Sequence, residues 1–240
     1  MRDLNLSGGE HVLELGCGVG AVFGIILETF PDLRVAGIDL QSTQIEYAHH
    51  YLNTLGFDNI DLCVGDATQL PWADGTFDHV YTIWLLEHVS NPKAILKEAY
   101  RVLKPGGKIT LTETDYKTLL IWPESPDYQY LQYSFCELFL HADGNPYMGR
   151  VLGALLTSVG FREVTNQPWG FHHFASAESQ ELDEFLEYVY SCLEPTLRQM
   201  TEKLGKDYQR LKAGLEFFRG LSKQPESAAT ITVYRASGTR

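Results

Sequence analysis

Short apolar runs alternate with longer amphipathic stretches along the first half of the chain. The short runs have the length of buried strands, and the longer stretches have the length of helices. Glycine or proline follows several of them and marks where they end. We expect Ser42 to cap one helix, with Gly56 just beyond its end. The pattern predicts strands at 11–15, 34–38, 60–64, 77–84 and 108–114, and helices at 19–30, 42–55 and 92–103.

Strands separated by helices of this length indicate right-handed βαβ crossovers and a mostly parallel sheet. The fold class is therefore α/β, with a doubly wound sheet. In such sheets ligands bind at the carboxyl ends of the strands, near the point where the strand order reverses. The residues that directly follow each strand are consequently the first candidates for a functional site.

The second half of the chain has a different pattern. An aromatic-rich stretch is followed by a helix at 146–158, a strand after Gly160, a helical stretch at 179–221 that Pro195 interrupts, and a final strand at 228–234. We expect one domain over residues 1–240. The segments 116–145 and 176–227 are predicted to be helical insertions that cover an edge of the sheet and form a substrate cover, since enzymes use such covers to exclude water.

The strongest motif is the glycine-rich turn after the first strand. Gly16, Gly18 and Ala21 fit the dinucleotide pattern G-x-G-x-x-G/A, which alone is ambiguous. Glu14 stands two residues before the first glycine. A carboxylate at this place repels a pyrophosphate and attracts an ammonium or a sulfonium group. The alternative is that Glu14 is a solvated charge at the end of a strand.

Two further acids follow the next two strands. Asp39 lies about 20 residues after the glycine turn, the interval at which a carboxylate meets the hydroxyl pair of a ribose. A helix cap or turn would also explain it. Asp66 is placed to accept from an exocyclic amino group while a neighbouring backbone N–H donates to a ring nitrogen, as in an adenine clamp. Its alternative is an Asx turn.

As a set, these motifs resemble the class I S-adenosylmethionine-dependent methyltransferases, and particularly the branch related to the ubiquinone and menaquinone methyltransferases. The stretches that carry the resemblance are 12–20, 37–39, 65–71 with 77–80, and 103–107. The resemblance covers about the first 115 residues, which are then the cofactor-binding core. It implies a Rossmann-like sheet of seven strands whose last strand, near 228–234, runs antiparallel.

The resemblance also implies a donor, S-adenosylmethionine, which leaves as S-adenosylhomocysteine. Glu14, Gly16 and Gly18 would surround the methionine portion, Asp39 the ribose, and Asp66 the base. Family members usually carry a small or apolar residue where Gln44 stands, so its role is less certain. The full set implied for the donor is Glu14, Gly16, Cys17, Gly18, Asp39, Leu40, Gln44, Asp66, Ala67 and Trp84.

Methyl transfer from a sulfonium is an in-line displacement in which alignment supplies much of the acceleration. No metal is expected, and a general base is needed only if the acceptor must lose a proton. Candidates for that base are Glu87, His88 and His141, while the pair His172 and His173 could face either way. We assign no catalytic residue. The aromatic stretch 116–139 either lines an acceptor pocket or packs a cover helix.

The amino-acid composition limits the classes of molecule that we expect the protein to bind. The net charge of −12 disfavours nucleic acid, which binds through lysine and arginine, so a small-molecule acceptor is favoured. No apolar run is long enough to span a bilayer, and the start of the sequence lacks the pattern of a secretory signal, so we expect a soluble, cytoplasmic protein. The four cysteines form no CxxC pair and predict neither a zinc site nor a disulfide framework.

Two other function classes stay open at this point. An NAD-dependent oxidoreductase would use the same glycines, although Glu14 and Asp66 argue against it. A catalytically silent scaffold would keep the fold but would have no use for Glu14, Asp39 and Asp66 together. The methylated atom and the oligomeric state are not determined by the sequence.

Overall fold

The computed structural model describes residues 6–58, 60–175 and 180–240. Within this part of the chain, no helix is both long enough and apolar enough to cross a membrane. The strands are β1 (His11–Leu15), β2 (Arg34–Asp39), β3 (Asp61–Val64), β4 (Phe77–Ile83), β5 (Leu103–Trp122), β6 (Arg162–Phe174) and β7 (Ala228–Thr239). The helices are α1 (Ala21–Thr29), α2 (Ser42–Thr54), η2 (Leu86–His88), α3 (Pro92–Val102), α4 (Pro126–His141), α5 (Met148–Val159), α6 (Glu181–Leu193), α7 (Thr196–Leu204), α8 (Tyr208–Arg219) and η3 (Leu221–Lys223).

The strands form one seven-stranded sheet in the order β3-β2-β1-β4-β5-β7-β6. Strands β1 to β5 pair in parallel, whereas β7 is antiparallel to both β5 and β6. The predicted fold class is confirmed, including the antiparallel last strand. The strand order reverses between β1 and β4, so the crevice where ligands bind in doubly wound sheets lies at the carboxyl ends of these two strands.

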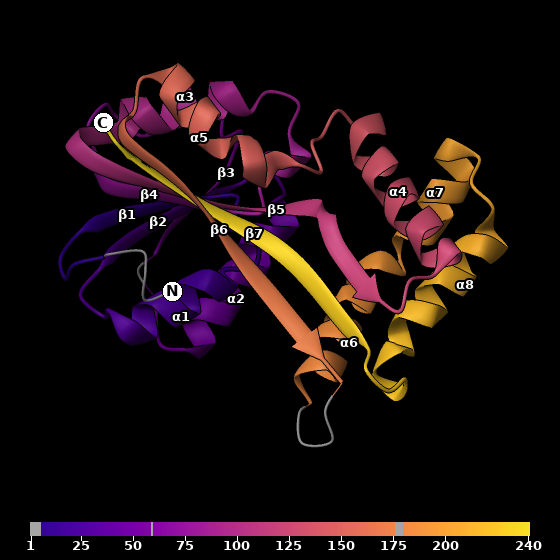
Figure 1. The fold of residues 1–240 in the computed structure, drawn as a ribbon. Helices are drawn as coiled ribbons and strands as arrows, with labels where there is room; N and C mark the ends of the chain where they lie inside the picture. The colour runs from indigo at the N-terminus through magenta and orange to yellow at the C-terminus, as the bar shows by residue number, and fades with distance from the viewer. Residues whose placement is uncertain (1–5, 59, 176–179) are drawn as a thin grey trace.

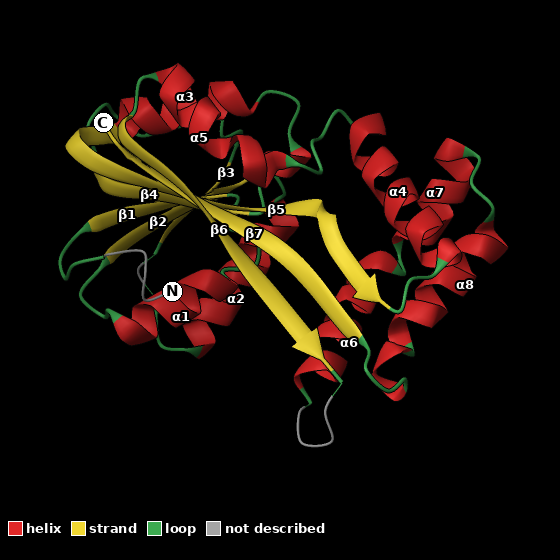
Figure 2. Cartoon of the chain, viewed as in Figure 1, coloured by secondary structure: helices red, strands yellow, loops and turns green. Residues whose placement is uncertain are grey.

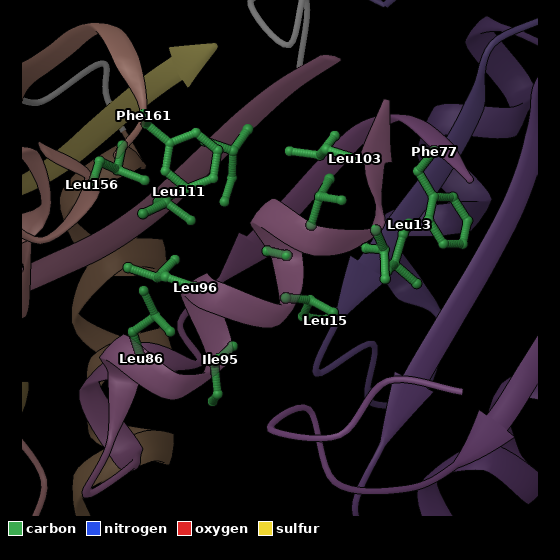
Figure 3. Close-up of a cluster of buried hydrophobic side chains, with 14 of the residues drawn as sticks. Leu13, Leu15, Phe77, Leu86, Ile95, Leu96, Leu103, Leu111, Leu156 and Phe161 are labelled. Carbon is green, nitrogen blue, oxygen red and sulfur yellow. The ribbon is translucent and has the colours of Figure 1, made fainter. Parts of the chain in front are cut away.

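Helices cover both faces of this part of the sheet (Figure 1). On one face α1 and α2 pack on a cluster that includes Val12, Phe23 and Tyr81. On the other face α3 and α5 pack on a larger cluster (Figure 3). Side chains of β1 alternate between the two clusters, as the period of a strand requires. Both faces are therefore buried, which explains why the strands read as apolar runs.

The last part of the chain builds a second, smaller core beyond the end of the sheet. Helices α4, α6, α7 and α8 contribute to a separate buried cluster that includes Leu131, Leu186 and Leu215. Strands β5, β6 and β7 continue past the other strands to reach these helices (Figure 2). The helices are thus attached to the sheet by its own long strands.

The predicted helical insertion 116–145 is partly wrong, because residues up to Trp122 extend β5. The strand passes through an irregularity between Asp115 and Leu120 and then pairs with β7 again. This bulge interrupts the alternation of polar and apolar residues that identifies a strand. Segment 116–145 therefore mixes strand and helix, whereas the described part of 176–227 is helical. Residues 176–179 lie outside the described part, and the role of both segments as a substrate cover remains a prediction.

Other differences lie at helix ends. Helix α1 begins at Ala21 because Gly20 takes a left-handed conformation, with φ of 77°. Gln41, and not Ser42, occupies the cap position of α2. The stretch 179–221 breaks near Pro195 as expected, and it breaks again at Gly205, where Asp207 caps the next helix by accepting from the backbone of Gln209 and Arg210.

Candidate functional site

The glycine turn after β1 is open toward the crevice. Gly16 and Cys17 donate their backbone N–H groups to the carbonyl oxygen of Ile38, at 2.8 and 3.1 Å, so the turn reaches across to the end of β2. Gly18 has a φ of 51°, and a Cβ atom added there would meet nothing within 4 Å. The backbone at Gly18 is consequently free for close approach by a ligand.

Glu14 lies on β1 directly below this turn. It is 3% exposed, and the Tyr81 hydroxyl donates to its Oε2 atom at 2.9 Å. Burial raises the pKa of Glu14 to about 8, while the hydrogen bond from Tyr81 opposes the rise. Glu14 is therefore not a solvated charge at a strand end. A cation beside it would favour its ionised form, and its role toward a cationic donor remains a prediction.

Asp39 connects the end of β2 to the glycine turn. Its Oδ2 atom accepts from the backbone N–H of Gly18 at 3.0 Å, and its Oδ1 atom accepts from that of Gln41 at 3.0 Å. Each carboxylate oxygen has a second lone pair. The residue thus makes the turn interactions that the sequence left open, and it retains acceptor capacity for a vicinal diol.

Exposed apolar side chains surround the same strand ends. Leu40 is 74%, Val64 is 53% and Trp84 is 45% exposed, and they stand at the ends of β2, β3 and β4 respectively. A flat, apolar ring lying there would remove this surface from water, at about 25 cal/mol per Å² of apolar area. This observation fits the adenosyl part of the donor.

The remaining residues predicted for the donor lie close to these strand ends in the chain. Gln44 is half-buried in the first turn of α2, and Ala67 packs partly against the sheet core. Asp66 is exposed, and its Oδ1 atom accepts from the backbone of Thr68 at 2.8 Å, so the Asx turn is present. Cys17 is buried, and burial raises the pKa of its thiol, which leaves it unreactive. Their contacts with a donor remain predictions.

Trp84 marks the end of β4 with a backbone conformation that bulky residues rarely adopt. Its φ is 54°, and two hydrogen bonds to β5 hold it there. Its backbone N–H donates to the Thr112 carbonyl at 2.9 Å, and its indole N–H donates to the Thr114 hydroxyl at 3.0 Å. Such strain is found mainly at functional sites, where the surrounding structure maintains it.

The buried carboxyl group of Glu113 fixes the loop that follows Trp84. Its Oε1 atom accepts from the backbone N–H groups of Leu85 and Leu86 at 3.0 and 2.7 Å, and its Oε2 atom accepts from that of Glu87 at 3.3 Å. The side chain of Leu85 in turn packs against the glycine turn, where a Cβ atom on Gly16 would lie 2.8 Å from it. Glu113 therefore fixes the position of this loop against the glycine turn.

Glu87 and Glu113 are two buried acids connected by the hydrogen bond from the Glu87 backbone N–H to the Glu113 side chain. Glu87 is 1% exposed, and its Oε1 atom accepts from the Tyr116 hydroxyl at 2.8 Å. Burial raises the pKa of both groups, and the like charge of Glu87 raises that of Glu113 further. Burial and the neighbouring carboxyl group therefore both disfavour the ionised form of Glu113, whereas a cation beside Glu87 would favour the ionised form of that group.

A cavity of about 360 Å³ opens beside this pair, between the ends of β4 to β7 and helices α4 and α6. Its wall is mainly apolar, and Glu87 and His88 belong to it. None of its lining residues is a lysine or an arginine. The aromatic side chains in its wall are Trp84, Tyr116, Phe135, Phe171, Phe185 and Tyr188.

The structure separates the histidines that the sequence offered as bases. His88 and His173 line the cavity. His88 stacks on Phe139 with ring centroids 5.1 Å apart, and burial lowers its pKa. His141 is exposed at the end of α4, and His172 is bonded to Thr230 on β7 at 2.7 Å. Neither of these two belongs to the cavity wall.

The sequence of the chain is similar to that of known methyltransferases. Residues 13–111 match the model of a methyltransferase domain. The chain is 33% identical over 121 residues to a demethylmenaquinone methyltransferase of Anoxybacillus flavithermus, covering 50% of this chain and 51% of that protein. It is 32% identical over 147 residues to a ubiquinone/menaquinone biosynthesis C-methyltransferase of Desulfotalea psychrophila, covering 61% and 54%.

Residues 13–111 therefore form a methyltransferase domain, and the chain is similar to S-adenosylmethionine-dependent methyltransferases. It spans about half the length of the curated relatives that it matches. Among solved structures, a protein of Bacillus halodurans C-125 shares its fold with a TM-score of 0.65 at 19% identity, over 100% of this chain and 99% of that one. Phosphoethanolamine N-methyltransferase 2 of Haemonchus contortus, solved with S-adenosylhomocysteine, has a TM-score of 0.61 at 17% identity, over 99% and 50%.

Sequence reasoning missed two residues of this methyltransferase, Glu113 and Tyr81. Glu113 is an acid within the apolar and threonine-rich strand β5. A charged residue inside a buried strand requires partners, and this signal could have identified it. Tyr81 lies opposite Glu14 in the β1 and β4 register, which only the strand pairing reveals.

Replacing Asp39 tests the donor assignment. Asp39→Ala leaves the Gly18 and Gln41 N–H groups without their acceptor and removes the predicted ribose contact. We expect affinity for S-adenosylhomocysteine, measured by calorimetric titration, to fall by about 1–3 kcal/mol. Asp32→Ala, a change at an exposed acid outside the crevice, serves as the control. Equal affinity in Asp39→Ala and the control would show that the ribose assignment is wrong.

The raised pKa of Glu14 predicts a pH dependence of stability. The group binds a proton more strongly in the folded state than in the unfolded state, so its contribution is present below about pH 4.5 and is lost as the pH rises through about 8. In the absence of donor, Glu14→Gln should therefore lose less stability than the unmodified protein between pH 5 and 9, with a difference on the order of a few kcal/mol. Thermal unfolding of both proteins across this range measures it, and parallel curves would contradict the assignment.

Proposed function

We propose that this methyltransferase transfers a methyl group from S-adenosylmethionine to a small-molecule acceptor held in the cavity beside Glu87. The observation that carries the proposal is the shared loop 84–88. Leu85 of this loop packs on the glycine turn, and Trp84, Glu87 and His88 belong to the cavity wall. The proposed donor crevice and the cavity therefore lie on either side of one short loop. Direct transfer of a methyl group between two bound molecules requires such proximity.

The residues of the chain would act mainly by binding and alignment. The donor, when bound, supplies an activated methyl group on its sulfonium. Glu14, Gly16 and Gly18 would hold its methionine portion, and Asp39 its ribose. The strained Trp84 would form the boundary between donor and acceptor, and Glu87 is placed to hold or accept a proton at the cavity wall.

The second core would serve as the substrate cover. Helices α4 and α6 contribute the outer wall of the cavity through Phe135 and through Phe185 and Tyr188. A cover of this kind keeps water from the reacting atoms. Residues 1–115 would then bind the donor, and the segments 116–145 and 176–227 would provide most of the acceptor wall.

A small organic acceptor fits these features better than a nucleic acid. The net charge of the chain is −12, and no lysine or arginine lines the cavity. Binding of nucleic acid depends on cations that neutralise phosphates. The aromatic wall favours a molecule with substantial apolar surface.

Calorimetric titration tests the proposed activity at its first step. S-adenosylmethionine and S-adenosylhomocysteine should both bind at one site, and NADH should not bind. Mass spectrometry of the protein incubated with cell extract and methyl-labelled donor should then detect a labelled small molecule. Binding of NADH without binding of either adenosyl ligand would instead support an oxidoreductase, and binding of none of the three would support a silent scaffold.

A further inference from the structure

We infer that the cavity selects an acceptor that carries a positive charge, an organic amine in its ammonium form, with Glu87 as the residue that binds this charge. The inference rests on the proposed function, because it assigns the chemical class of the acceptor to the same cavity. Three features of the described residues support it: the sign of the charge at the wall, the aromatic faces, and the way Glu87 is held.

The acid of the cavity wall faces no lysine or arginine among the described lining residues. Glu87 lines the cavity, and a cation beside its carboxyl group favours the ionised, negatively charged form. An ion pair in such a partly desolvated place is much stronger than one in bulk water. A phosphate or carboxylate group on the acceptor would meet repulsion instead, and no lysine or arginine of the wall could offset it.

The aromatic rings of the cavity wall also favour a positively charged ligand. Six aromatic side chains line the cavity, from the residue that follows β4 and from β5, β6, α4 and α6. The faces of aromatic rings attract cations, and the effect reaches about 2 kcal/mol or more where water is excluded. An ammonium with apolar substituents would gain from both the rings and the carboxylate.

Glu87 is held so that it can bind a cation without rotating away. Tyr116 donates to its Oε1 atom at 2.8 Å, and Tyr116 itself packs against Phe135 with ring centroids 5.2 Å apart. Its Oε2 atom is buried and has no hydrogen-bond partner among the described residues, so one acceptor of this carboxyl group is left for a ligand. The hydrogen bond from Tyr116 holds the other oxygen, which limits the entropy lost when a ligand binds.

The same carboxylate can receive the proton that an ammonium must lose before it reacts. An amine arrives as R–NH₃⁺ and gives one proton to the Glu87 carboxylate that binds it, after which the amine and this carboxyl group are both neutral. The nitrogen then carries the free electron pair that a nucleophile needs. Charge and protons balance within the cavity, and no metal or further base is required for this step.

Matched probes of different charge test the inference in the protein saturated with S-adenosylhomocysteine. Choline carries a fixed cation, 3,3-dimethylbutan-1-ol is its uncharged isostere, and 3,3-dimethylbutanoate carries a negative charge. In calorimetric titrations choline should bind about tenfold or more tightly than the alcohol, and the anion should bind more weakly than the alcohol. Equal binding of choline and the alcohol, or tighter binding of the anion, would overturn the inference.

Two variants test whether the preference for the cation depends on side chains of the cavity wall. Glu87→Gln keeps the shape of the side chain and should reduce the affinity for choline to that for the alcohol, whereas Glu184→Gln, an exposed acid on α6 outside the cavity wall, should leave the preference intact. If Glu87→Gln fails to fold, Phe185→Leu gives the second test, since it removes one ring from the cover and should weaken choline more than the alcohol. A preference for choline that survives both variants would contradict the site.

The titration with S-adenosylhomocysteine that precedes these measurements keeps the two claims separate. If S-adenosylhomocysteine does not bind, the proposed function fails at the donor. If it binds and the cavity shows no preference for the cation, the proposed function stands and only the acceptor class is wrong.

Discussion

The buried carboxyl group of Glu113 is the constraint on which the site depends. It accepts three consecutive backbone N–H groups, those of Leu85, Leu86 and Glu87, in a place where an unsatisfied donor would cost about 1–3 kcal/mol each. The loop therefore has one conformation. That conformation places Leu85 against the glycine turn and Glu87 in the wall of the cavity, so a single side chain determines how the glycine turn and the cavity lie relative to each other.

The same arrangement gives a function to two acids in a buried place. Burial raises the pKa of both, and the like charge of Glu87 raises the pKa of Glu113 further. A hydrophobic pair would pack there at lower cost, but it would neither fix the loop nor present a charge to the cavity. The strained Trp84, bonded through its indole to Thr114 on the same strand, belongs to this unit as well.

Much of the proposed donor site could be predicted from sequence because its residues are recognised from the residues next to them in the chain. Strands and turns follow from apolar runs and glycines, and the acids Glu14, Asp39 and Asp66 stand at fixed places after strands. The cavity could not be predicted in the same way. Its wall comes from β4 to β7 together with α4 and α6, segments far apart in the chain, and the bulge in β5 concealed that residues to Trp122 belong to a strand. Pairing partners such as Tyr81 opposite Glu14 become visible only once the sheet is assembled.

A crystal structure of the protein with S-adenosylhomocysteine tests the central claim most directly. Our account predicts that the amino group of the ligand lies within hydrogen-bonding reach of the Glu14 carboxylate or one water away. It also predicts that the sulfur faces the cavity past Trp84, with the loop 84–88 still bonded to Glu113. A ligand whose sulfur points away from the cavity, or a loop released from Glu113 in the complex, would contradict the account.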